Sequence, residues 1–115
     1  MIRVGVLVSG GGTNLQAIID AVKNGDITNT SLEVVLSNKK DAYALTRAKD
    51  NNIAAECVCI KDYETRDEFN RAFIEKIDAY NLDLIVLAGF LVVLPPEFIA
   101  KYRNCLLYTS PSHET

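Results

Sequence analysis

The sequence lacks the features that mark several large classes of protein. No apolar stretch approaches the roughly 20 residues that a membrane-spanning helix needs, and the chain starts on strand-like sequence rather than on a basic and then apolar leader. Basic residues are not in excess, because 12 lysines and arginines stand against 15 aspartates and glutamates, for a net charge of −3. That balance argues against a nucleic-acid footprint. We therefore expect a cytoplasmic protein that acts on a small molecule and binds neither nucleic acid nor membrane.

Residues that commonly hold metal ions or form disulfides are also few. The chain has three cysteines and one histidine. Cys57 and Cys59 occupy alternate positions of a strand-like run, with no histidine or second cysteine pair close to them. This pattern favours free, buried or half-buried thiols over a redox or metal site. We expect no bound metal ion.

What is present is ordinary globular material, with 49% hydrophobic residues and no repeat or linker that would divide the chain. Apolar runs typical of buried strands occupy residues 2–8, 31–37, 53–60 and 83–90, and amphipathic segments that predict helices start at about residues 13, 42, 65 and 96. This alternation predicts an α/β fold with a doubly wound parallel sheet. Ligands of such sheets bind where the winding reverses, which here means after Val8 and after Ala88.

A glycine-rich loop joins the first strand to the first helix, over Ser9-Gly10-Gly11-Gly12-Thr13-Asn14. The third glycine of the dinucleotide fingerprint would fall on Leu15, and a Walker A lysine is absent, which disfavours a nicotinamide cofactor and an ATPase. A helix N-terminus behind such a loop still suits a phosphate, because its free N–H groups and dipole face the anion. In the alternative interpretation, the loop binds no ligand and is only a tight turn before a capped helix. Asn14 either solvates the first helical turn or reaches a ribose or phosphate oxygen.

Three motifs carry a resemblance to a known family. The segments Val8–Gln16, Ser37–Lys39 and Val86–Phe90 resemble, in order and spacing, those of folate-dependent phosphoribosylglycinamide formyltransferases, over about residues 1–104. The resemblance implies a Rossmann-like sheet. It also implies a reaction of purine biosynthesis, in which the amine of phosphoribosylglycinamide attacks the formyl carbon of 10-formyltetrahydrofolate, the formyl donor.

The same resemblance assigns binding residues. Gly12, Thr13 and Asn14 would hold the phosphate of the substrate. Arg66 matches an arginine that borders the folate site, although its position also suits an exposed residue of a first helical turn. The pterin pocket would be lined by Leu91, Val92, Val93 and Leu94. Many members have an arginine where this chain has Val92, which removes one polar contact.

The residues that would carry the chemistry are not found in this chain. The family's Asn-x-His-Pro-Ser motif falls in register on residues 108–112, where Tyr108 and Ser110 replace the asparagine and the histidine, and its aspartate lies further downstream. A formyl transfer needs a positioned acid or base and an oxyanion partner. The lone His113 is three positions from the matching site, which on a strand changes its face. We therefore assign no catalytic residue to this chain.

The end of the chain has a resemblance of its own. Residues 105–115 resemble the translation of a transposase sequencing adapter. We therefore expect residues 1–104 to be the N-terminal part of a formyltransferase domain, truncated after about four strands, and residues 105–115 to be a non-native tail. Such a fragment would be inactive, would retain the phosphate site and would self-associate through the exposed sheet edge at residues 84–88. The alternative is a non-catalytic Rossmann-like module that binds a phosphate or nucleotide.

Overall fold

The computed structural model describes residues 1–10, 13–90 and 94–108. Strands and helices alternate along the chain, with a short 3₁₀ helix η1 before α3. Their bounds are β1 Ile2–Val8, α1 Thr13–Lys23, β2 Thr30–Ser37, α2 Tyr43–Asp50, β3 Ala54–Cys57, η1 Ile60–Asp62, α3 Arg66–Asp78, β4 Leu84–Leu87, α4 Pro96–Lys101 and β5 Leu106–Tyr108. Over these described residues, no helix has both the length and the apolar character that crossing a membrane requires.

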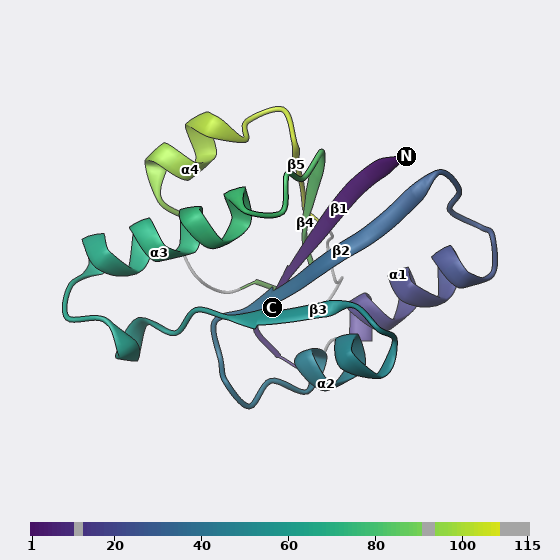
Figure 1. Ribbon diagram of the computed structural model, residues 1–115, viewed down its shortest axis with the longest axis horizontal. Coiled ribbons are helices and arrows are strands. Elements are labelled where there is room, and N and C mark those ends of the chain that lie inside the picture. The colour runs from purple at the N-terminus through teal and green to yellow at the C-terminus, as the bar shows by residue number, and fades with distance from the viewer. Residues whose placement is uncertain (11–12, 91–93, 109–115) are drawn as a thin grey trace.

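The strands form one parallel sheet in the order β3-β2-β1-β4-β5. The chain winds outward from β1 to β3, returns to the other side of β1 as β4 and continues to β5, so the predicted doubly wound α/β fold is confirmed (Figure 1). β5 adds a strand to the four expected. It pairs with β4 from Leu106 onward, and the amide of Ile85 donates to the carbonyl of Cys105 at 2.7 Å. β4 therefore lies inside the sheet, and the prediction that residues 84–88 form an exposed edge was wrong.

Helices cover both faces of the sheet. α1 and α2 lie on one face, and α3 and α4 lie on the other (Figure 1). Along β1, Val4, Val6 and Val8 pack in the cluster formed with α1 and α2, whereas Leu7 packs in the cluster formed with α3 and α4. Because neither face of the strand meets water from Val4 to Val8, a run without polar residues is the expected sequence pattern there.

Several helix ends form as the sequence predicts. At α3, Thr65 Oγ1 accepts a hydrogen bond from the amide of Glu68 at 3.1 Å, which is the first half of a capping box. Gly25 adopts a φ of +84° after α1, and Pro96 is the first residue of α4. Two strands are shorter than predicted: β3 ends where β2 ends, and β4 ends one residue before β1 does. Cys57 pairs with Ser37, the last residue of β2, and Leu87 pairs with Leu7.

A polar cluster joins the end of α3 to the end of α4. The hydroxyl of the buried residue Tyr102 donates to Asp78, whose other carboxylate oxygen lies 2.6 Å from the ammonium of Lys101. Burial opposes the charge of Asp78, but the hydrogen bonds from Lys101 and Tyr102 outweigh it and hold the pKa of this carboxyl below its ordinary value. Burial, and then the hydrogen bond to Asp78, raise the pKa of Tyr102. Tyr102 therefore favours the charged carboxylate of Asp78, and Asp78 favours the protonated hydroxyl of Tyr102.

Candidate functional site

The chain adds β2 and β3 on one side of β1 and then β4 and β5 on the other side. The direction of winding therefore reverses between β1 and β4, which are neighbours in the sheet. The amide of Ala88, just after β4, donates to the carbonyl of Leu7 at 2.9 Å, so the segments that follow the two strands leave the sheet side by side. α1 begins at Thr13 and Asn14 is half-buried in its first turn. Gly12 lies outside the described residues, so only two of the three predicted phosphate ligands are placed. The helix N-terminus therefore opens at the edge where an α/β sheet binds its ligands.

Three polar contacts fasten the glycine loop and α1 to the neighbouring β2–α2 unit. The hydroxyl of Ser9 donates to Asn38 Oδ1 at 2.7 Å, the amide of Ala44 donates to the carbonyl of Gly10 at 3.4 Å, and Arg47 Nη1 donates to Gln16 Oε1 at 3.0 Å. Sequence reasoning gave no role to Ser9 or to Asn38. Both stand in the family motifs, directly after β1 and after β2, and this shared position was the available signal.

The segment after β4 turns sharply and packs on aromatic residues. Gly89 has a φ of +74°, in the left-handed region that side chains rarely adopt. The ring of Phe90 stacks on Phe73 with centroids 5.8 Å apart. Of the predicted pterin-pocket residues, Leu91, Val92 and Val93 lie outside the described residues. The side chain of Leu94 is buried with Phe98 in the α3–α4 face, so it anchors this segment to the core.

Arg66 lies exposed in the first turn of α3. Its guanidinium carbon is 5.6 Å from the ring centroid of Phe69, and its Nε donates to Asn70 Oδ1 at 3.3 Å. Phe69 stacks on Phe73, which in turn stacks on Phe90. A continuous series of rings therefore connects Arg66 to the start of segment 90–94, the two parts of the predicted folate site.

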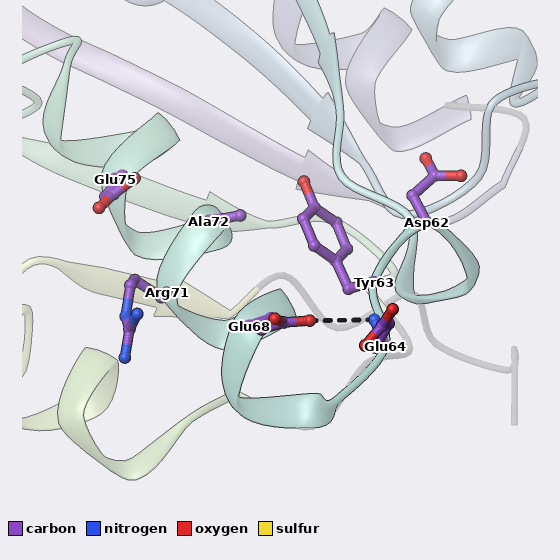
Figure 2. A pocket seen from close by; sticks show the side chains of 7 residues that line it. All are labelled: Asp62, Tyr63, Glu64, Glu68, Arg71, Ala72 and Glu75. Atoms are coloured by element: carbon purple, nitrogen blue, oxygen red, sulfur yellow. Dashed lines mark hydrogen bonds between the residues drawn. The ribbon is translucent and has the colours of Figure 1, made fainter.

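A hollow of about 450 Å³ between η1 and α3 does not suit an anionic ligand. Four carboxylates line it, from Asp62, Glu64, Glu68 and Glu75, together with the ring of Tyr63 and a single cation, Arg71 (Figure 2). Glu68 Oε1 is already engaged with the amide of Glu64 at 3.1 Å, the contact dashed in Figure 2. The excess of negative charge repels a phosphate or a carboxylate. We therefore place the candidate site by the strand ends and not by the size of this hollow.

A second hollow, of about 400 Å³, lies beyond the ends of β2 and β3. It is lined by residues 38–41 and 59–62, and Lys40 pairs there with Asp62 at 2.9 Å with both side chains exposed.

The three cysteines, Cys57, Cys59 and Cys105, are half-buried free thiols. Burial, and then the neighbouring Cys59, raise the pKa of Cys57, which disfavours a reactive thiolate. Across the described ranges of the chain, no group of three or more metal-ligating side chains is found.

Comparisons with known proteins agree on one family. The Formyl transferase family model matches residues 2–112. Phosphoribosylglycinamide formyltransferase of Escherichia coli is 44% identical over 107 residues, which cover 93% of this chain and 50% of that protein. The trifunctional purine biosynthetic protein adenosine-3 of Chironomus tentans is 43% identical over 111 residues, or 96% of this chain and 8% of that protein.

A solved structure shows the same fold. The crystal structure of glycinamide ribonucleotide transformylase 1 from Symbiobacterium toebii superposes with a TM-score of 0.86 and 37% sequence identity, over 97% of this chain and 54% of that one. The chain thus spans about half the length of the single-function relatives that it matches.

Proposed function

This chain belongs to the formyl transferase family, and we propose that it is the half of a phosphoribosylglycinamide formyltransferase that holds the phosphate of the substrate and part of the formyl-donor site. The observation that carries the proposal is the start of α1 at Thr13, beside the segment after β4, at the point where the sheet reverses its winding. The free N–H groups of the first turn face outward there and suit a phosphate. In this proposal Gly12, Thr13 and Asn14 bind the phosphate of phosphoribosylglycinamide.

The residues present also fit the formyl donor, 10-formyltetrahydrofolate. Its glutamyl tail carries carboxylates, and the exposed guanidinium of Arg66 is of the opposite charge. Its pterin is a flat heteroaromatic ring with hydrogen-bonding edges, and the segment that the resemblance assigns to it runs between Phe90, which stacks on Phe73, and the buried Leu94. We therefore assign Arg66, Leu91, Val92, Val93 and Leu94 to the donor site.

The reaction of the whole enzyme joins the two sites. The amine of phosphoribosylglycinamide attacks the formyl carbon, the bond from that carbon to N10 of the donor breaks, and tetrahydrofolate leaves. The intermediate oxyanion and the proton that passes from the amine to N10 need polar partners. By resemblance these partners fall on residues 108–112, where the chain has Tyr108 and Ser110. We propose that the chain binds substrate without transferring the formyl group. His113 has no assigned part.

Titration calorimetry of the 115-residue chain with phosphoribosylglycinamide tests the binding proposal. We expect saturable binding that inorganic phosphate competes, a weaker affinity for Asn14→Ala, and no heat from nicotinamide dinucleotides. Absence of binding to the unaltered chain would overturn the proposal.

A fusion tests the catalytic part and separates it from a non-catalytic binding module. The chain is joined to the C-terminal half of the Escherichia coli relative, once as it stands and once with Tyr108→Asn and Ser110→His. We expect formyl transfer only from the substituted fusion. Equal activity of both fusions would refute the roles assigned to residues 108 and 110, and inactivity of both would favour the binding module.

Two expectations stay predictions. The division into residues 1–104 and a non-native tail at 105–115 is tested by genomic DNA on both sides of codon 104, which should continue into an Asn-x-His-Pro-Ser motif. The cytoplasmic location is tested by fractionating cells that express the whole gene.

A further inference from the structure

We propose that Ser9 and Asn38 are positioning residues for the phosphate loop, acting through the hydrogen bond that joins them. The inference rests on the proposed function, because it concerns the same loop. We assign neither residue a contact with the phosphate. Their hydrogen bond fixes the position at which the loop leaves the sheet.

The two residues stand at equivalent points of neighbouring strands. Val8 and Ser37 are paired as the last residues of β1 and β2, so Ser9 and Asn38 are the first residues beyond the sheet on each strand. Ser9 is 1% exposed, and its hydroxyl lies 2.7 Å from Asn38 Oδ1, the usual length of an O–H···O hydrogen bond. Breaking a buried hydrogen bond is costly, so this contact fixes the direction in which the chain leaves β1 at Ser9.

Two further contacts join Gly10 and helix α1 to the same β2–α2 unit. The Gly10 carbonyl accepts from Ala44 in the first turn of α2, and Gln16 of α1 accepts from Arg47 of α2. The glycine loop thus has polar contacts to the β2–α2 unit at its beginning and just beyond its end. A loop held before the ligand arrives loses less conformational freedom on binding, which strengthens binding without any added contact to the ligand.

Asn38 is the residue through which this support can be tested most cleanly. It is half-buried and outside the hydrophobic clusters, so Asn38→Ala removes the acceptor without opening a cavity in the core. Ser9→Ala removes the donor. If the two side chains act through one hydrogen bond, the affinity lost in the double variant should equal that lost in either single variant.

The experiment measures phosphoribosylglycinamide affinity by titration calorimetry for the full chain, the two single variants and the double variant. Thr65→Ala is the control, since it removes one side-chain hydrogen bond at the N-terminus of α3, away from the glycine loop. Circular dichroism and urea unfolding of each variant verify the fold. We expect an affinity loss of about fivefold to tenfold in both single variants, the same loss in the double variant, and no loss in Thr65→Ala.

The possible outcomes separate this inference from the proposed function. Wild-type binding with unchanged affinity in Ser9→Ala and Asn38→Ala would overturn the inference and leave the function standing. Losses that multiply in the double variant would show that the residues act independently, which also overturns it. A loss as large in Thr65→Ala would reduce the effect to general destabilisation. If the unaltered chain does not bind phosphoribosylglycinamide, the proposed function and the inference fall together.

Discussion

The polar cluster of Asp78, Lys101 and Tyr102 between α3 and α4 should make the free energy of unfolding depend on pH in both the acid and the alkaline range. The substitution Tyr102→Phe isolates the contribution of the Tyr102–Asp78 hydrogen bond. The substitution keeps the buried ring against Phe98, at 4.9 Å between centroids, and removes only the hydroxyl that donates to Asp78. A hydrogen bond to a charged acceptor contributes about 1.5–3 kcal/mol. Because the Asp78 side chain is 34% exposed, solvent screens the pair and we expect the lower end, about 1.5 kcal/mol near pH 7.

The sign of the pH dependence follows from the two pKa shifts. Asp78 has a lowered pKa in the folded chain, so its contribution is present above the ordinary value of 3.8 and is lost as the pH falls through the folded value. Tyr102 has a raised pKa, so its contribution is present below the ordinary value of 10.0 and is lost as the pH rises toward the folded value. The stability difference between the unaltered chain and Tyr102→Phe should therefore be greatest between these limits.

Urea unfolding followed by circular dichroism measures this difference across a series of pH values. Asp78→Asn keeps an acceptor and removes the charge. Its free energy of unfolding should therefore fall less steeply at acid pH than that of the unaltered chain. Tyr43→Phe, at an exposed tyrosine of α2, is the control and should change the free energy of unfolding by less than about 0.5 kcal/mol. A loss in Tyr102→Phe that stays constant from the acid to the alkaline limit would refute the assigned charge coupling.

Two further changes test local packing and capping by the same unfolding measurement. Thr65→Ala should cost about 1 kcal/mol, because it removes the acceptor for the Glu68 amide, whereas Glu68→Gln keeps its acceptor oxygen and should be nearly neutral; equal losses would count against the capping box. Gly5→Ala should cost about 1–2 kcal/mol, because its Cβ would lie 2.4 Å from Leu82 Cδ1 in the core, whereas a Cβ on Gly10 meets nothing within 4 Å and Gly10→Ala should leave stability nearly unchanged. A neutral Gly5→Ala would mean that Leu82 repacks freely.

Local chemistry made much of the fold predictable from the sequence. Thr65 and Glu68 mark a helix start because their side chains bond the backbone within one turn, and Pro96 and Gly25 act through their own backbone geometry. The absence of polar residues from Val4 to Val8 of β1 follows from burial on both faces. These signals depend on neighbours in the sequence, so a single sequence contains them.

Features that depend on distant neighbours were missed. Residues 53–60 read as one strand, but β3 stops at Cys57 because its partner β2 stops at Ser37. β5 was not predicted, because residues 105–115 resemble a non-native tail and the strand follows only from the pairing of Leu106–Tyr108 with β4. The Ser9–Asn38 contact joins residues 29 positions apart, and neither residue is distinctive alone. The glycine loop was found from its own residues, whereas its support could be found only from the fold.

The central position of β1 has a consequence for how the chain assembles as it is synthesised. One side of this strand pairs with β2 soon after both have emerged, but the other side waits for β4, and the backbone of Arg3 meets Asp83 across 80 positions of sequence. Closing so long a loop is slow compared with forming the β1–β2–β3 layer, so that layer should form first on the ribosome. Until Leu87 emerges, the innermost strand of the finished sheet is an open edge, and a nascent chain stalled there would present it to chaperones.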